Sequence, residues 1–211
     1  MNNGIGSGFL EQRDGGLSMF GLSIVERMNQ VGMAVDLSHC ADQTTMDGIA
    51  ASKRPVVFTH ANCRALAPSL TRLKTDEAIR GMAKTGGVMG VAFIRFMVRE
   101  QEPVTIEHVL DHVDYTAKLV GVEHVAVGSD LDMVGNPNPI GGGMDPKKQP
   151  NFDRYHFHTD SAGKLTIAGL DHPKRMFDLT EGLIRRRYSD ADISAILGGN
   201  AVRVLTQIWK A

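Results

Sequence analysis

The feature that most limits the fold of this 211-residue chain is an alternation of helix-sized and strand-sized segments. Apolar residues recur at helical spacing from Met19 to a terminating Gly32, and a short apolar run follows at 33–39. This pair of patterns then repeats three times. Further helices are expected at 42–52, 75–86 and 104–120, and further strands at 55–60, 88–94 and 125–129. Such alternation predicts parallel strands joined by crossover helices.

Four such units make half of an eightfold (β/α) barrel, and they also fit part of a doubly wound sheet. No strand is followed by the Gly-x-Gly-x-x-Gly loop of a dinucleotide-binding sheet. The chain is therefore predicted to be an α/β protein that forms a single partial domain. Its expected parts are a leading loop at 1–17, four units at 18–130, a long irregular loop at 131–170 and C-terminal helices at 171–211.

The composition excludes several classes of protein. Hydrophobic residues make up 42% of the chain and charged residues 22%, as in ordinary globular proteins. The net charge is −1, which leaves no basic footprint for nucleic acid or anionic lipid. No apolar run approaches the roughly 20 residues of a membrane span, and the first residues lack the pattern of a signal peptide. We therefore expect no nucleic-acid partner and no membrane segment, and we favour a cytoplasmic location.

Ionisable residues follow three of the four expected strands: His39, His60 and Asp130. In a barrel, the carboxyl ends of the strands form one rim, and active sites are built there. Neighbouring strands lie about 4.8 Å apart, so histidines at adjacent ends can share one zinc ion at Zn–N distances of about 2.1 Å. The competing interpretation is that each histidine is only a hydrogen-bonded residue at a strand end.

Side-chain alternation predicts which strand faces are turned inward. We expect the inward faces to be those that lead to His39, His60 and Asp130. The other members of these faces are Val35, Leu37, Val56, Phe58, Ala126 and Gly128. Asp36 alternates with the first of these sets, so it is expected to face the helix layer and to have a structural role.

Several short motifs occur in the order and spacing of one enzyme family. They are Val35-Asp36-Leu37-Ser38-His39, Phe58-Thr59-His60 followed by Asn62 and Arg64, Arg72 followed by Thr75-Asp76-Glu77, Gly86-Gly87-Val88-Met89-Gly90-Val91, and His124-Val125-Ala126-Val127-Gly128-Ser129-Asp130-Leu131-Asp132. Each motif alone is weak, but the series resembles the membrane dipeptidase (renal dipeptidase) family from about residue 10 to the end of the chain. The resemblance implies the C-terminal half of a TIM-like (β/α)8 metallohydrolase barrel.

The resemblance also implies roles for four residues. His39 and His60 match the two histidines that bind the second zinc of a binuclear centre. Arg72 matches the arginine that pairs with the terminal carboxylate of the substrate, a task that suits a bidentate guanidinium. Asp130 matches the aspartate that acts as an acid and base near the metal. The implied activity is hydrolysis of dipeptides, in which zinc acidifies a water molecule and polarises the scissile carbonyl.

The chain departs from the family's pattern in two respects. Leu73 stands where the better-known members carry asparagine, and the loop from His60 to Arg72 is one residue longer. The family also has a His-x-Asp pair, a glutamate that bridges both metals and a substrate-binding histidine, and no segment of this chain matches them. We therefore expect the chain to be a fragment that carries only the second-site ligands of the zinc centre.

Other histidines and acids are weaker candidates for a metal site. His156 and His158 form a His-x-His pair within the expected long loop, and Asp132 follows the last strand, so we expect loop or capping roles for them. His108 and His112 lie one turn apart on an expected helix. We expect both of these histidines at the surface of that helix.

Two other functions stay open. The chain could belong to an amidohydrolase-like enzyme that cleaves an amide or ester other than a dipeptide. It could also be a non-catalytic half-barrel that associates with itself or with a partner to cover its sheet. The hydrolase interpretation predicts that zinc binding depends on His39 and His60. The half-barrel interpretation predicts a stable oligomer that a metal chelator does not affect.

Overall fold

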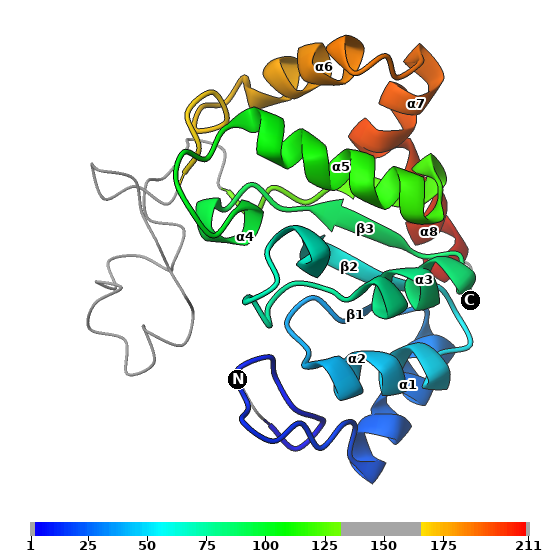
Figure 1. Ribbon diagram of the computed structural model, residues 1–211. Helices are drawn as coiled ribbons and strands as arrows, with labels where there is room; N and C mark the ends of the chain where they lie inside the picture. The colour runs from blue at the N-terminus through cyan, green and yellow to red at the C-terminus, as the bar shows by residue number, and fades with distance from the viewer. Residues whose placement is uncertain (1–2, 132–165, 210–211) are drawn as a thin grey trace.

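A four-stranded parallel sheet forms the centre of the protein (Figure 1). The computed structural model describes residues 3–131 and 166–209. The strands lie in chain order, so each crossover returns the chain beside the preceding strand. Their bounds are β1 (Val35–Asp36), β2 (Val56–Ala61), β3 (Val88–Val91) and β4 (Val125–Val127). The predicted α/β fold with four parallel strands is confirmed.

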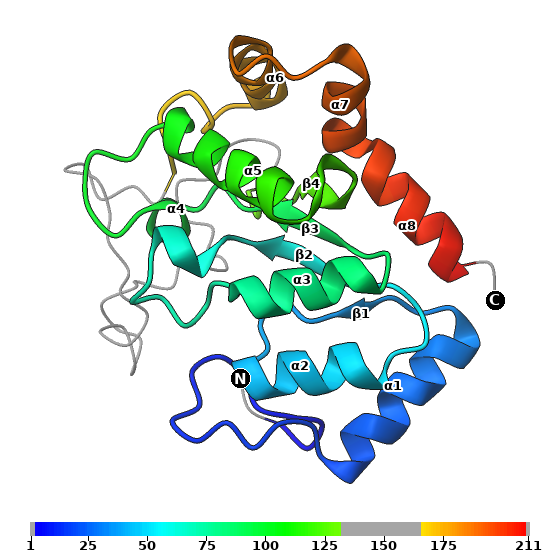
Figure 2. The ribbon, with the colours of Figure 1, turned by 45° about the vertical axis from the view of Figure 1, so that its right-hand side comes forward.

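Helices connect the strands and cover the sheet. They are α1 (Met19–Val31), α2 (Asp42–Ala51), α3 (Asp76–Lys84), α4 (Arg95–Val98), α5 (Ile106–Val120), α6 (Arg175–Arg185), α7 (Asp190–Ser194) and α8 (Asn200–Trp209). Shorter helical segments are η1 (Arg64–Leu66), η2 (Val122–His124) and η5 (Ala195–Gly199). In Figures 1 and 2, α2, α3 and α5 lie along one side of the sheet, and α8 lies near the end where the strands begin.

Local sequence signals set several helix ends. The Ser18 hydroxyl accepts a hydrogen bond from the backbone N–H of Gly21 and so caps α1. Gly32 ends α1 in the left-handed conformation, at φ 71°, which glycine adopts without steric cost. Thr75 caps α3 in the same way as Ser18 caps α1, by accepting from Ala78. The predicted end of α1 and the predicted start of α3 are thus confirmed.

The inward faces predicted for β1 and β2 are wrong. Val35, Leu37 and Phe58 pack with apolar side chains of the helices, including Val25 of α1 and Ile79 of α3. These side chains therefore face the helix layer. Apolar residues occupy both faces of a buried parallel strand, so hydrophobicity alone does not distinguish the inner face from the outer one.

The opposite, inner face of the sheet carries Asp36, Val57, Val88 and Ala126, which are linked by the strand register. Its apolar members pack against Val204 and Ile208 of α8. Asp36 therefore lies on the inner face, and the prediction that it faces the helix layer is wrong. The prediction for β4 was right, because Ala126 is on this face.

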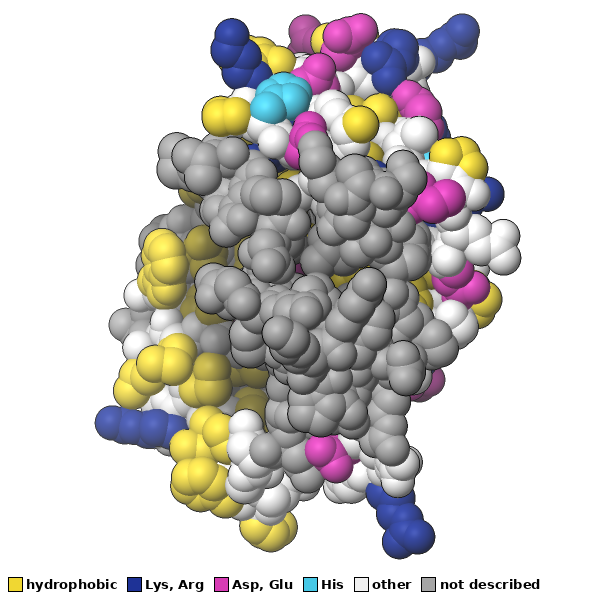
Figure 3. Space-filling model, turned by 90° about the vertical axis from the view of Figure 1, so that its left-hand side faces the viewer, with side chains coloured by type: hydrophobic (Ala, Val, Ile, Leu, Met, Phe, Trp, Pro, Cys, Tyr) yellow, Lys and Arg dark blue, Asp and Glu magenta, His cyan; other side chains and the backbone are white. Residues whose placement is uncertain are grey.

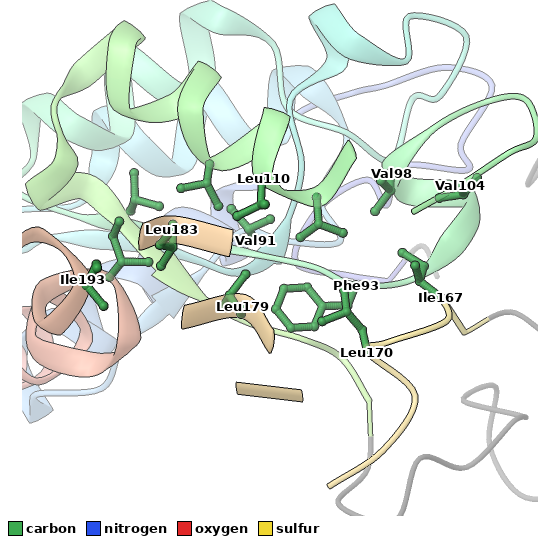
Figure 4. Packing of buried hydrophobic residues seen from close by; sticks show 14 residues of the cluster. Val91, Phe93, Val98, Val104, Leu110, Ile167, Leu170, Leu179, Leu183 and Ile193 are labelled. Carbon is green, nitrogen blue, oxygen red and sulfur yellow. The ribbon is translucent and has the colours of Figure 1, made fainter. Parts of the chain in front are cut away.

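The largest described apolar cluster joins β3 and β4 to α5, α6 and the C-terminal helical segment. Phe93 lies at its centre in Figure 4, close to Leu170 and Leu179. Leu110 of α5 packs so closely on α6 that a Cβ atom at Gly182 would meet its methyl groups. This packing fixes α5 and α6 on the last two strands.

His112 is fully buried, so the prediction that it lies on the surface of its helix is wrong. Its Nδ1 accepts a hydrogen bond from the backbone N–H of Cys63 at 3.2 Å, and its Nε2 donates to the carbonyl oxygen of Val98 at 2.8 Å. One ring therefore ties α5 to the segments that follow β2 and β3. Only the neutral tautomer with a proton on Nε2 satisfies both bonds. His108 forms a capping box with Thr105 at the start of α5.

The buried neutral His112 predicts a loss of stability in mild acid. Burial lowers its pKa to about 4 from an ordinary value of 6.5. The unfolded chain then binds the extra proton first, so stability is fully present above pH 6.5 and is lost as the pH falls toward 4. We expect the free energy of unfolding in urea to fall by about 2 kcal/mol between pH 7 and pH 5 on account of this residue. A stability that is flat over this range would contradict the buried neutral ring.

Candidate functional site

His39 and His60 meet at the carboxyl ends of β1 and β2. Their Nε2 atoms are 2.7 Å apart, and the centroids of the two rings are 4.8 Å apart. The structure thus brings together the two histidines that spacing alone placed at adjacent strand ends. The predicted alternation of side chains does not explain this meeting. Neither ring lies on the same face as the residues that precede it at alternate positions of its strand.

A bulge in β2 turns His60 to the inner face. Phe58 pairs with Met89 and Ala61 with Val91, so β2 has one residue more than β3 between these pairs. An extra residue bends a strand and redirects its side chains. His60 therefore projects on the same side as Thr59, although the two residues are adjacent. His39 reaches the site because β1 ends at Asp36 and the chain then turns.

Two glycines make room for this bulge. A Cβ atom at Gly90 of β3 or at Gly128, just after β4, would overlap the carbonyl oxygen of Thr59. The backbone of Thr59 therefore lies closer to Gly90 and Gly128 than it could if either residue had a Cβ atom. These glycines belong to the motifs noted in the sequence, and the structure gives them a physical reason.

The Asp36 carboxylate forms the base of the site. It accepts hydrogen bonds from the backbone N–H groups of Ser38 and Thr59, at 3.0 and 3.1 Å, and from their hydroxyls, at 2.6 and 2.7 Å. Partial burial opposes ionisation, but these bonds outweigh it and lower the pKa of Asp36. The hydroxyl oxygen of Thr59 lies 2.9 Å from His60 Nδ1. Asp36 is thus linked through Thr59 to a candidate metal ligand, in contrast to the structural role in the helix layer that side-chain alternation predicts.

Both histidines are held in the neutral form at neutral pH. Desolvation, followed by the positive charge of Arg72, lowers the pKa of His39 to about 4. The same two causes, in the same order, lower the pKa of His60. Neutral imidazoles are the form that binds metal ions. The two neutral rings can therefore bind a cation without first losing a positive charge.

The Arg72 side chain is only 4% exposed and contacts the backbone next to both histidines. Its Nη2 donates to the carbonyl oxygen of His60 at 2.8 Å, and its Nη1 donates to that of Ser38. The guanidinium also lies over the ring of Phe9, 5.7 Å from its centroid. Burial lowers its pKa to about 10, so the charge persists at neutral pH. Arg72 therefore joins the ends of β1 and β2 and places a positive charge beside them.

Asp130 is an exposed residue just beyond the end of β4. Its backbone is left-handed, at φ 58°, a conformation that aspartate adopts more readily than most residues. Its charge raises the pKa values of His60 and Arg72 against the lowering effect of burial. The structure thus places this acid within electrostatic reach of both residues. Unusual backbone conformations of this kind cluster at functional sites.

Other motif residues hold the strand ends in place. The buried Asn62 amide donates to the carbonyls of Ala92 and Met97 and accepts from Ala92 N–H. Arg64 makes a bidentate salt bridge with Asp42, with both distances 2.7 Å. These contacts fix the loops after β2 and β3.

Two residues near the site gave no signal in the sequence. The Phe9 ring lies 5.8 Å from that of His39. The buried Lys74 donates to the carbonyl of Cys40 and to the Thr45 hydroxyl, and burial lowers its pKa to about 7. An isolated aromatic residue in a glycine-rich loop and a lysine in a polar run are both common at protein surfaces, so neither pattern predicted burial.

The pair fits a metal ion in part. Two nitrogens on one tetrahedral zinc lie about 3.4 Å apart at Zn–N distances of about 2.1 Å, so the rings need to part by less than about 1 Å. A catalytic zinc takes three protein ligands. Within residues 3–131 and 166–209, no group of three or more His, Cys, Asp or Glu side chains could hold a metal ion. His156, His158 and Asp132 lie outside these residues, as does most of the predicted loop at 131–170.

Comparison with known proteins identifies the family. The model of the membrane dipeptidase family, peptidase family M19, matches residues 3–153 and 158–211. The chain belongs to the membrane dipeptidase family. This confirms the resemblance drawn from the motifs, and it places the histidine pair in a family of metallopeptidases.

Individual relatives and solved structures agree with this family assignment. The dipeptidase verJ of Clonostachys rogersoniana is 34% identical over 92% of this chain and 42% of its own length. An amidohydrolase from Pseudomonas aeruginosa has the same fold, with a TM-score of 0.83 and 30% identity over all of this chain and 62% of that one. A metallopeptidase from Rhodobacter sphaeroides, bound to a phosphinate mimic of the dipeptide L-Ala-D-Ala, has a TM-score of 0.71 and 22% identity over 92% of this chain and 48% of its own. The chain thus spans about half the length of these relatives.

The close approach of Thr59 to β4 predicts that Gly128→Ala is strongly destabilising. The added methyl group meets backbone, which cannot rotate away as a flexible side chain can. We expect the free energy of unfolding in urea to fall by about 3 kcal/mol, the upper end of the usual cost of overpacking. Gly4→Ala is the matched control, because nothing lies within 4 Å of a Cβ atom there. If both variants are equally mild, the bulge does not lie against Gly128.

Proposed function

We propose that this chain carries the second-zinc half of the active site of a zinc-dependent dipeptidase. In this proposal, His39 and His60 bind the zinc, and the enzyme cleaves the peptide bond of dipeptides with a metal-activated water molecule. The observation that supports it best is the 2.7 Å approach of the two Nε2 atoms at the rim of the sheet. Zinc, when bound, supplies Lewis-acid chemistry that polarises a carbonyl and makes water more acidic.

The other two predicted residues have roles that suit this reaction. Asp130, exposed at the end of β4, is proposed to hold and deliver the proton that the leaving amine needs. Arg72 is proposed to attract the terminal carboxylate of the dipeptide. Its two bonds to carbonyl oxygens use two of the five N–H groups of a guanidinium, and its charge persists at neutral pH.

The other ligands of a binuclear zinc centre are proposed to come from the part of the barrel that this chain does not match in its relatives. The described sheet has β1 and β4 at its edges, and these strands are proposed to pair with the rest of a closed barrel. Association between copies of the chain is a further proposal for covering the same edges. The substrate is proposed to be a small peptide, as the phosphinate complex of the Rhodobacter sphaeroides metallopeptidase supports.

Figure 3 views the side to which the strands point, and acidic and basic side chains are scattered over its described part. No helix of the described residues is long and apolar enough to cross a membrane.

Zinc content tests the proposal directly. We expect the chain to bind zinc in equilibrium dialysis, as measured by mass spectrometry, and we expect His60→Ala to bind much less because one of two nitrogen ligands is gone. His124→Ala is the matched control. This histidine lies where β4 begins, and its Nδ1 donates to the Gly87 carbonyl at 2.8 Å. Equal zinc content in the wild type and in His60→Ala would remove the proposed site. Hydrolysis of dipeptides by the whole protein, lost on chelation and restored by zinc, tests the activity itself.

A further inference from the structure

We propose that Asp36 is a positioning residue that acts through Thr59 to fix the tautomer of His60. In this arrangement the His60 proton is on Nδ1, and the lone pair of Nε2 points to the place of the proposed zinc. The inference rests on the proposed function, because the tautomer of His60 matters to the enzyme only if the proposed site binds zinc. Its structural part concerns only hydrogen atoms on described residues, so it can be tested in the absence of metal.

The number of hydrogen atoms on Ser38, Thr59 and His60 determines which atom donates in each bond. The hydroxyls of Ser38 and Thr59 each have one hydrogen, and each lies within 2.7 Å of a different oxygen of the Asp36 carboxylate. An ionised carboxylate only accepts, and the two hydroxyls lie closer to it than to each other, where the distance is 3.2 Å, so both hydrogens point to Asp36. The Thr59 oxygen, 2.9 Å from His60 Nδ1, therefore has only lone pairs to offer that nitrogen. The proton of the bond must come from His60.

The tautomer of His60 also determines that of His39. A neutral imidazole has one N–H, so a proton on Nδ1 of His60 leaves Nε2 with a lone pair. His39 Nε2, at 2.7 Å, is then the donor to it in the metal-free chain. Metal-binding histidines commonly use their second ring nitrogen in this way, as a donor to a group that sets ring orientation and tautomer. Here that group is the hydroxyl of Thr59, which is itself set by Asp36.

The two oxygens of Asp36 are not equivalent, and this makes an isosteric test possible. Oδ1 accepts from both backbone N–H groups and from the Ser38 hydroxyl, whereas Oδ2 accepts from the Thr59 hydroxyl alone among the described residues. In Asp36→Asn the amide oxygen must take the Oδ1 place, because two backbone donors face it. The NH2 group then faces Thr59 and donates to its oxygen. The Thr59 hydrogen turns to His60 Nδ1, and the His60 proton moves to Nε2.

The nitrogen chemical shifts of the imidazoles report this change. In the metal-free wild type at neutral pH, long-range proton–nitrogen spectra are expected to show His60 protonated on Nδ1 and His39 protonated on Nε2. In Asp36→Asn, both assignments are expected to exchange. A general structural role of Asp36 would disturb the spectrum without exchanging the two tautomers. If His60 has its proton on Nε2 in the wild type, or keeps it on Nδ1 in Asp36→Asn, the inference is overturned.

Substitutions at Thr59 provide a matched pair. Thr59→Ser keeps the hydroxyl and is expected to keep the wild-type tautomers. Thr59→Val keeps the shape but removes the oxygen, and it is expected to leave His60 as a mixture of tautomers. Identical spectra for the Ser and Val variants would also overturn the inference. Well-dispersed backbone spectra of each variant show that it has folded.

Zinc titration links the tautomer to the proposed site. A proton on His60 Nε2 occupies the ligand position, so the Kd for zinc is expected to rise about 10- to 100-fold in Asp36→Asn and Thr59→Val, and to stay near the wild-type value in Thr59→Ser. A wild type that binds no zinc, but shows the expected tautomers, contradicts the proposed function and leaves the positioning role of Asp36 standing. Equal zinc affinity in the wild type and the three variants overturns the link between the His60 tautomer and zinc binding.

Discussion

The site depends on the one extra residue in β2 between its pairs with β3. The extra residue turns Thr59 and His60 to the same side, although successive residues of a regular strand point to opposite faces. The Thr59 carbonyl then lies across Gly90 and Gly128, and its N–H and hydroxyl reach the Asp36 carboxylate. The bulge is therefore held from both sides, by hydrogen bonds to β1 and by close backbone contact with β3 and β4.

Charges around the pair are arranged so that the rings stay neutral. Arg72 is buried beside the strand ends, and its charge adds to desolvation in lowering the pKa values of both histidines. The negative charge of Asp36 acts in the opposite direction and raises both pKa values, but it does not outweigh desolvation and Arg72. Its oxygens accept four hydrogen bonds from backbone N–H groups and hydroxyls. The rings can therefore act as neutral nitrogen ligands, as zinc requires.

The sequence predicted the elements well and their environment less well. Local patterns were sufficient for the parallel sheet and for the ends of α1 and α3, because caps and periodicity are properties of neighbouring residues. The inner face of β2 was predicted wrongly because a bulge depends on the register with β3, which no local pattern reveals. The burial of His112 escaped for a similar reason, since its partners, Cys63 and Val98, belong to distant segments. The family motifs named His39, His60, Arg72 and Asp130 as candidate site residues. They did not reveal the hydrogen bonds of Asp36 to Ser38 and Thr59, because these depend on how β1 and β2 lie together in the fold.

The central claim is that the rings of His39 and His60 face one cation. X-ray absorption at the zinc edge of the zinc-loaded chain tests it most directly, because the outer-shell scattering of imidazole rings gives the number of histidines bound. The account predicts two imidazoles at about 2.0–2.1 Å from zinc in the wild type, and one in His60→Ala. A zinc ion without imidazole ligands, or with the same number in both proteins, would contradict it.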